Sequence, residues 1–177
     1  AIRVDDDRYS DWDSFAAYWK QAGSLITSAS GLGITSDDAT ADMLVANDLG
    51  VDVDIIASGG SGDNVTFLLN GTTDFLMGNV SEMVAAHNDG QFKILCVFAE
   101  ERDSNLPDVP TYEELTGNLV VGCSSRGYAM LKDVPDDIKQ ILGDAVKAAV
   151  QDPDLIEQLN AIYTTTCLLY TSPSPRD

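Results

Sequence analysis

The chain holds few of the residues that metal or nucleophilic chemistry needs. Its single histidine is His87, and its three cysteines, Cys96, Cys123 and Cys167, form no C-x-x-C pair. One histidine excludes most metal sites and argues against a serine–histidine–aspartate triad. His87 is predicted at the C-terminal end of a helix, where a cation is favourable. The sequence therefore predicts no metal or other cofactor.

Long apolar runs and basic residues are scarce as well. No run approaches the roughly 20 apolar residues that span a bilayer, so no membrane insertion is expected. The 177 residues include 10 Lys and Arg against 29 Asp and Glu, a net charge of −19. So acidic a chain repels phosphate backbones and anionic membrane surfaces, which excludes nucleic acid as an expected partner. The acids are spread along the chain, as on a solvated surface, and Asp5–Asp7 are interpreted as a solvated turn.

The two ends differ from the rest of the chain. Ala1 leads straight into a predicted strand, without a Met or a signal peptide. Residues 167–177 contain Ser-Pro-Ser-Pro, which cannot continue a helix, and they resemble a translated sequencing adapter. We expect a fragment, with residues 167–177 as a non-native tail that packs against nothing.

Between the ends, strands and helices alternate. With an apolar content of 44%, the chain is expected to form a globular fold. Strands are predicted over 24–28, 51–56, 73–77, 92–99 and 119–123, and helices over 10–23, 36–48, 81–88 and 135–151, with shorter helices after Gly62, Thr111 and Asp152. Three successive units of strand, loop and helix predict an α/β fold with a parallel sheet.

Each of the first three strands is followed by a loop rich in small residues. In a parallel sheet such loops meet at the carboxyl edge, where helix N-termini bind anions through backbone N–H groups without Lys or Arg. The candidate ligand-binding residues are Ser30, Gly31, Gly33, Ile34, Thr35, Ser36 and Asp37 in the first loop, Gly60 and Ser61 in the second, and Gly78, Asn79 and Ser81 in the third.

Two other interpretations of these loops remain open. Gly31–Ser36 has the pattern G-x-G-x-x-S, close to a dinucleotide fingerprint, with Asp52 about 20 residues further on. Asp52, however, lies near the start of its predicted strand and not at the end that would hold a ribose. Asp37 and Asp38 form either an acid–base pair or a helix start that favours acids, and the second is the more common role.

Four segments together resemble one family, the substrate-binding proteins of tripartite tricarboxylate transporters (Bug or TctC-like). They are Ser30–Gly33 with Ser36; Gly59–Gly62 with Leu68–Gly71 and Asp74; Gly78–Glu82; and Leu106–Leu115. The resemblance implies two α/β lobes of the type II periplasmic-binding kind. Residues 1–118 would form a complete lobe two with a parallel sheet, and residues 119–166 the C-terminal part of lobe one.

The resemblance also implies a function. Members of this family are periplasmic, non-enzymatic receptors that close around a small organic carboxylate and deliver it to the membrane components of the transporter. The ligand is held by backbone N–H and hydroxyl groups, and the full-length receptor is expected to be a monomer without a cofactor. The alternative is a nucleotide-dependent α/β enzyme that uses the Gly31–Gly33 loop.

The chain departs from the family at Asp37–Asp38, where less acidic residues are usual, and at Ser125, where an aromatic residue often stands. Two like charges about 6 Å apart repel by roughly 2.8 kcal/mol at an effective dielectric constant of 20. Asp37 is therefore expected to point away from the pocket, or the ligand to carry an amine or a hydroxyl.

Overall fold

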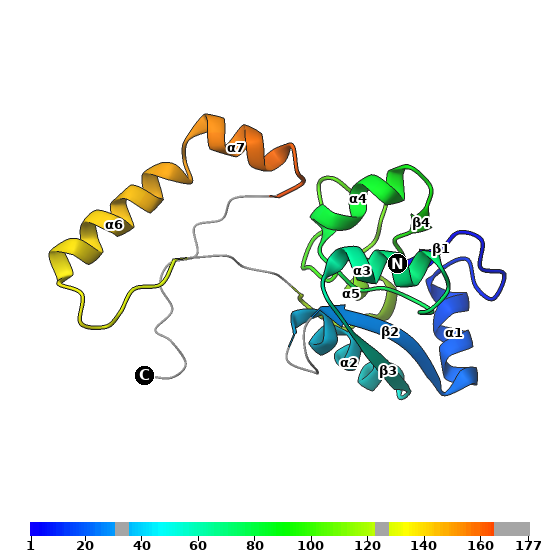
Figure 1. Ribbon diagram of the computed structural model, residues 1–177. Coiled ribbons are helices and arrows are strands. Elements are labelled where there is room, and N and C mark those ends of the chain that lie inside the picture. The colour runs from blue at the N-terminus through cyan, green and yellow to red at the C-terminus, as the bar shows by residue number, and fades with distance from the viewer. Residues whose placement is uncertain (31–35, 123–127, 165–177) are drawn as a thin grey trace. The chain divides into compact units, whose positions relative to one another are not determined.

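The computed structural model describes residues 1–30, 36–122 and 128–164, which fall into two units, Ala1–Ser125 and Arg126–Asp177 (Figure 1). Residues 167–177, the predicted tail, lie outside the described residues. The first unit contains β1 (Ile2–Arg3), α1 (Trp12–Ala22), β2 (Ser24–Ser30), α2 (Asp37–Leu49), β3 (Asp52–Ser58), α3 (Ser61–Leu69), α4 (Val80–Asn88), β4 (Phe92–Lys93) and α5 (Tyr112–Thr116). The second contains α6 (Asp136–Ala149) and α7 (Pro153–Asn160). None of the helices in the described ranges is both long and apolar enough to cross a membrane.

The helix boundaries follow from capping residues. Asp11 caps α1, one residue after the start predicted for this helix. Its side chain accepts a hydrogen bond from the Ser14 backbone N–H, and the Ser14 hydroxyl accepts one from the Asp11 backbone N–H. Gly23 ends α1 with φ +82°, a conformation in which glycine carries no steric penalty. A capping box of Thr111 and Glu114 starts α5, which confirms the short helix predicted after Thr111.

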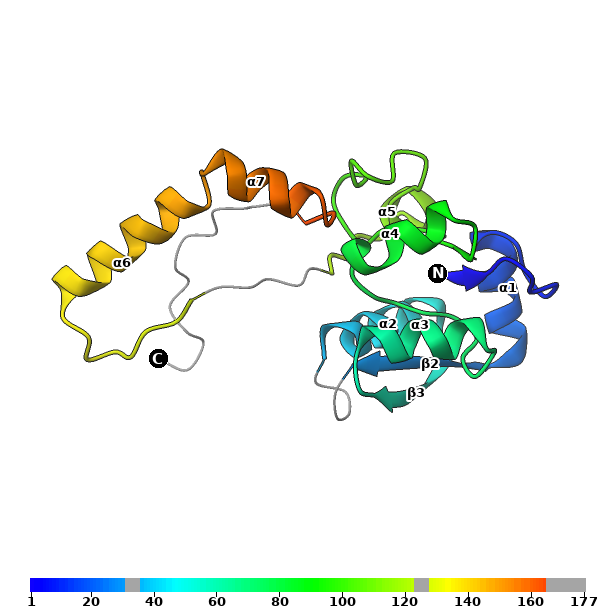
Figure 2. The same cartoon turned by 45° about the horizontal axis from the view of Figure 1, so that its top comes forward.

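The two long strands, β2 and β3, are parallel and lie side by side (Figure 2). Their ladder runs from Ser24–Asp52 to Ser30–Ser58. Leu25 belongs to the same buried cluster as Val45 of α2, whereas Ser30 accepts a hydrogen bond from Asn64 of α3. Because successive strand residues point to opposite faces, α2 and α3 pack on opposite faces of β2. This is the predicted βαβ winding.

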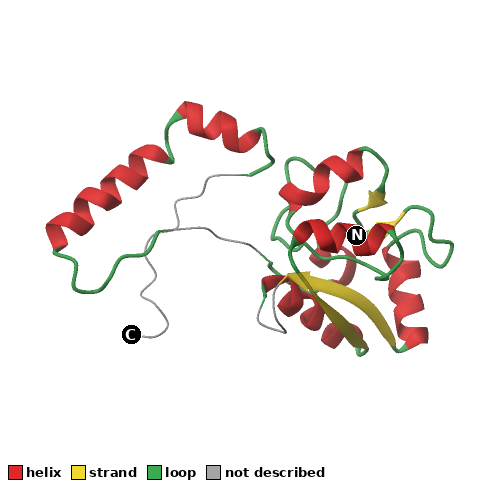
Figure 3. Ribbon diagram, in the orientation of Figure 1, coloured by secondary structure: helices red, strands yellow, loops and turns green. Residues whose placement is uncertain are grey.

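The other predicted strands are wrong in extent. Residues 73–77, between α3 and α4, are loop (Figure 3). They run beside β2 without forming a ladder, because the Asp74 carboxylate accepts the Ile26 N–H at 2.8 Å in place of a backbone carbonyl. Only Phe92–Lys93 of the predicted 92–99 strand is a strand, and it pairs antiparallel with β1. Residues 119–122 form no strand. The parallel sheet of the described residues therefore has two strands.

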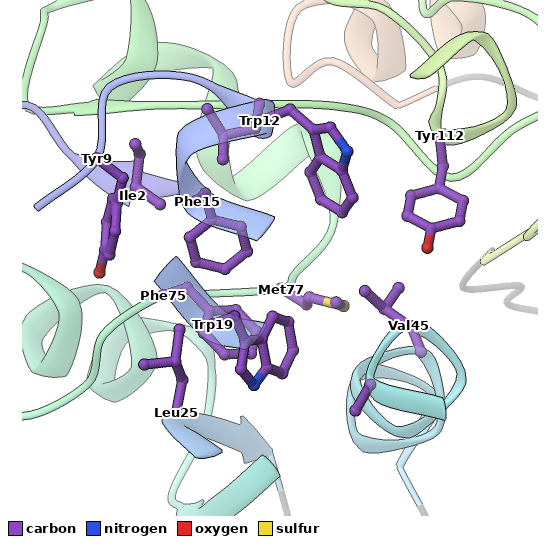
Figure 4. Close-up of a cluster of buried hydrophobic side chains, with 13 residues drawn as sticks. Ile2, Tyr9, Trp12, Phe15, Trp19, Leu25, Val45, Phe75, Met77 and Tyr112 are labelled. Carbon is purple, nitrogen blue, oxygen red and sulfur yellow. The ribbon is translucent and has the colours of Figure 1, made fainter. Parts of the chain in front are cut away.

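An aromatic cluster forms the core of the first unit (Figure 4). Trp12, Phe15 and Trp19 of α1 are buried, which confirms the predicted apolar face of this helix. The Trp19 ring lies 4.8 Å from that of Phe75, and the Trp12 ring lies 5.2 Å from that of Tyr112. The core therefore joins α1, β2 and α2 to the segments around Phe75 and Tyr112.

Residues 128–164, the described part of the second unit, form no comparable core. No residue of α6 or α7 is buried. Ile138, Ile141 and Leu142 of α6 are 42%, 62% and 46% exposed and lie three or four residues apart or adjacent, on one side of the helix. An exposed apolar stripe of this kind marks a surface for association.

We expect the 177-residue chain to bind a hydrophobic dye through this stripe. Replacing both Ile141 and Leu142 by serine should remove most of the dye fluorescence and leave the melting temperature of the first unit unchanged, since neither side chain is buried. Val4→Ser is the control, because Val4 is 59% exposed but lies in the first unit. A wild-type chain that binds no dye would contradict the expectation.

Candidate functional site

The carboxyl ends of β2 and β3 form one edge. Ser30 pairs with Ser58 at the end of the ladder, and the Ser58 hydroxyl donates to the Ala29 carbonyl at 3.2 Å. The loops that lead to α2 and α3 therefore start next to each other, as in other parallel sheets that bind ligands at this edge.

The first loop ends at a well-formed helix start. The Ala39 backbone N–H donates to the Ser36 hydroxyl at 3.2 Å, so Ser36 caps α2 at the start predicted for this helix. Asp37 is exposed, which agrees with the interpretation that its negative charge interacts favourably with the positive end of the helix dipole. Asp38 is half-buried, so the two acids have different surroundings. Gly31, Gly33, Ile34 and Thr35 of the predicted site lie outside the described residues.

The second loop brings α3 to the end of β2. Gly60, at φ +153°, is the N-cap residue of α3, and Ser61 is its first residue; no side chain caps this end. A Cβ placed on Gly60 would meet nothing within 4 Å, so the space beside it is open. The buried Asn64 donates from Nδ2 to the Ser30 hydroxyl at 3.3 Å. This bond holds the first turn of α3 against Ser30.

The third loop leads into α4. Gly78 is exposed, and Asn79 and Ser81 are half-buried. Asn79 is the N-cap residue but makes no side-chain capping bond, and its Nδ2 donates to the Glu82 carboxylate at 3.4 Å. Glu82 in turn raises the pKa of Asp38, which places the first turns of α4 and α2 near each other. Ser30 is thus in contact with α3, and α2 lies near α4.

The sequence interpretation missed the partial burial of Asp38 and did not consider Asp42. Burial raises the pKa of Asp38, Glu82 and Asp37 raise it further, and a backbone hydrogen bond from Ser30 lowers it. Asp42, one turn along α2, is fully buried, and neither of its carboxylate oxygens has a hydrogen-bond partner. Burial raises the pKa of Asp42 well above its usual range. The available signal was the position of Asp42 between Ala39 and Val45, on the apolar side of the helix.

This geometry suits anion binding more than catalysis. The N-termini of α2, α3 and α4 follow the sheet edge or lie near it, and a helix N-terminus adds about half a positive charge. Among residues 1–30, 36–122 and 128–164, no group of three His, Cys, Asp or Glu residues could hold a metal ion. His87 lies at the far end of α4, where Nδ1 is 3.3 Å from the Phe92 carbonyl and the Ile94 nitrogen.

Comparison with known proteins gives the family. The model of the tripartite tricarboxylate transporter family receptor, TctC, matches residues 5–165. A UPF0065 protein from the TAR-I ttuE–ttuC′ intergenic region of Agrobacterium vitis is 28% identical over 154 residues, which are 86% of this chain and 43% of that protein.

Two solved structures share this fold over part of their length. A TctC solute-binding protein from Polaromonas, solved without ligand, is 26% identical with a TM-score of 0.74; the match covers 94% of this chain and 56% of that one. MatC from Rhodopseudomonas palustris, with bound malate, is 24% identical with a TM-score of 0.74, over 99% of this chain and 57% of MatC. The chain thus spans about half the length of these relatives and has an α/β fold that matches part of them.

The family match bears on the two functional classes considered above. TctC proteins are solute-binding receptors and not enzymes, so the prediction of a non-enzymatic protein is confirmed and the nucleotide-dependent enzyme is not. The match extends over nearly the whole chain, through both described units. The chain belongs to the tripartite tricarboxylate transporter receptor family.

Proposed function

We propose that the chain is part of a periplasmic receptor that captures a small organic carboxylate and delivers it to the membrane components of a tripartite tricarboxylate-type transporter. In this proposal residues 1–118 form lobe two and residues 119–166 the C-terminal part of lobe one, as the family resemblance implies. Two similar solved structures, a periplasmic transporter and the periplasmic binding protein BugD, support the location. The half-length match to relatives supports a receptor longer than this chain.

The proposal that the ligand is a carboxylate rests on one observation. The helices α2 and α3 start just after the carboxyl ends of β2 and β3, which lie side by side. Backbone N–H groups at such an edge bind carboxylates without a basic side chain. The candidate contacts are those that the sequence predicts, from Ser30 to Asp37, at Gly60 and Ser61, and at Gly78, Asn79 and Ser81. Malate in MatC identifies dicarboxylates as the first class to try.

Closure of the two lobes on the ligand is the expected mechanism. A ligand that contacts both lobes binds only the closed state tightly, and so it shifts the population toward that state. Calorimetric titration of the full-length receptor with mono- and dicarboxylates tests the proposal. Heat from a carboxylate, without turnover, supports it; heat from a nucleotide and from no carboxylate would contradict it.

A substitution at Gly60 tests whether the ligand approaches the backbone at the start of α3. Gly60→Ala should weaken carboxylate binding about tenfold, because the new Cβ enters the open space beside the α3 N-terminus and φ +153° is strained for alanine. Gly143→Ala is the matched control: it lies in the interior of α6 with nothing within 4 Å of its Cβ, and alanine favours the helix there by about 1 kcal/mol. Equal carboxylate affinities of the two variants would show that the α3 N-terminus does not contact the ligand.

A further inference from the structure

The buried amide of Asn64 is only partly hydrogen-bonded. Asn64 is the fourth residue of α3 and is 2% exposed. Its Nδ2 donates to the Ser30 hydroxyl at 3.3 Å, but its Oδ1 has no hydrogen-bond partner among the described residues. An unpaired buried acceptor costs more free energy than one neutral hydrogen bond returns. Stability therefore does not explain this amide, and natural proteins depart from such rules chiefly at functional sites.

Ser30, the partner of Asn64, is held from both helices at the end of β2. Its backbone N–H donates to the Asp38 carboxylate of α2, so this N–H is not available to a ligand. Its hydroxyl accepts from Asn64 of α3 and donates to no acceptor within the described part of the chain. A serine hydroxyl has one proton and two lone pairs. Because Asn64 occupies a lone pair, the proton is left to bind another acceptor.

Ser58 links the same two elements a second time. Its hydroxyl lies 3.2 Å from the Ala29 carbonyl and 3.4 Å from the Gly60 carbonyl. Together with the bond from Asn64 to Ser30, this contact connects the start of α3, which has no side-chain cap, to the last two residues of β2. Affinity requires that a binding group be held in a narrow range of geometry by the residues behind it. These links fix the Ser30 hydroxyl at the edge where the proposed ligand binds.

We propose that Asn64 is a positioning residue for ligand binding: it holds the Ser30 hydroxyl so that the hydroxyl proton points to the ligand carboxylate. The inference rests on the proposed carboxylate-binding function and adds to it a residue that acts through Ser30. A hydroxyl without this partner rotates freely, and ordering it on binding lowers the affinity. Asn64 therefore raises affinity for the ligand and lowers the stability of the fold.

Two measurements on the full-length receptor at pH 7.5 test the proposal, the melting temperature and the calorimetric affinity. The probe is the acid that binds the wild-type receptor most tightly among malate, succinate, adipate and pyruvate. Asn64→Ala should melt at or above the wild-type temperature, because it removes the unpaired acceptor and alanine favours the helix. It should nevertheless bind the probe about fivefold more weakly, the usual effect of losing one neutral hydrogen bond.

Ser30→Ala tests whether Asn64 acts through the Ser30 hydroxyl. This variant should bind the probe about tenfold or more weakly, because a hydrogen bond to a charged ligand is lost. Adding Asn64→Ala to Ser30→Ala should cause little further loss, since the hydroxyl that Asn64 orients is already absent. Asn70→Ala is the matched control: Asn70 lies at the other end of α3, where its Oδ1 accepts from Thr72, and the variant should keep wild-type affinity.

The outcomes separate this inference from the proposed function. Wild-type affinity in folded Asn64→Ala, or losses that add fully in the double variant, would overturn the positioning role while the carboxylate receptor stands. A lower melting temperature with unchanged affinity would show that Asn64 is only structural. If no mono- or dicarboxylate binds the wild-type receptor, both proposals are wrong.

Asn64→Asp decides if Asn64→Ala does not fold. The aspartate side chain has nearly the same shape as asparagine, but its carboxylate only accepts hydrogen bonds. It would take the Ser30 proton away from the ligand, so this variant should bind the probe at least about tenfold more weakly. Wild-type affinity in Asn64→Asp would overturn the positioning role.

Discussion

Trp19→Ala should destabilise the first unit by about 3–5 kcal/mol, the usual range for removing a large aromatic side chain from a core. Trp19 is fully buried between α1 and the sheet, and its ring packs on Phe15 and Phe75 at centroid distances of 5.5 and 4.8 Å. Its indole N–H also donates to the Asp52 carbonyl at 2.8 Å, so the variant leaves that acceptor at the start of β3 unpaired.

The measurement is denaturant unfolding followed by far-UV circular dichroism, which does not depend on tryptophan emission. Since total stabilities are commonly 5–15 kcal/mol, we expect the variant to be largely unfolded or close to it. Trp19→Phe is the control: it keeps an aromatic ring, loses the indole hydrogen bond, and should cost clearly less. A Trp19→Ala midpoint equal to that of the wild type would show that this cluster is not the core that holds the unit together.

The helices were predictable because their signals are local. Ser36, Thr111 and the apolar positions of α1 act within one or two turns of the residues that they order. The strands were less predictable, because a strand forms only where a second, distant segment of the chain pairs with it. Residues 73–77 have a strand-like sequence, yet the Asp74 side chain takes the Ile26 N–H and replaces the ladder. No pattern within the segment indicates that bond.

The backbone elements that form the candidate site were predictable from the sequence, but the burial of its acidic side chains was not. The end of β2, the Ser36 cap and the start of α3 follow from strand, loop and helix order. Whether an acid faces water depends on what packs over it. Asp37 and Asp38 are neighbours, but Asp38 lies near Glu82, which is 44 residues away in the sequence. Asp42 is buried by the packing of α2, which composition alone does not reveal.

The acidic run at the start of the chain shows the same limit, because Asp6 is not solvated as predicted. Its side chain is 3% exposed, with Arg3 at 2.8 Å and Arg8 at 2.7 Å. Arg8 also donates to Asp74 at 2.6 Å, and the second Asp74 oxygen accepts the Ile26 N–H. Arg8 therefore connects the first turn of the chain to the segment that borders β2.

Arg8→Ala should destabilise the first unit by about 3 kcal/mol at pH 7, because it leaves the buried Asp6 and the mostly buried Asp74 without this partner. Arg102→Ala is the matched control. The Arg102–Glu114 pair is also short, at 2.9 Å, but its side chains are 44% and 45% exposed, so we expect a loss of at most about 1 kcal/mol. Thermal and urea unfolding at pH 7 measure both losses; equal losses would mean that burial does not set the strength of these pairs.

The same network predicts an acid transition. Hydrogen bonds from Arg8 and its charge lower the pKa of Asp6 to about 2, from an ordinary value near 3.8. A carboxylate whose pKa is lower in the folded state stabilises the protein above the unfolded pKa, and this stabilisation is lost as pH falls through the folded pKa. Wild-type stability should therefore drop between about pH 4 and pH 2. Arg8→Ala should flatten this drop, since Asp6 then titrates closer to its ordinary pKa in both states, whereas Arg102→Ala should retain it.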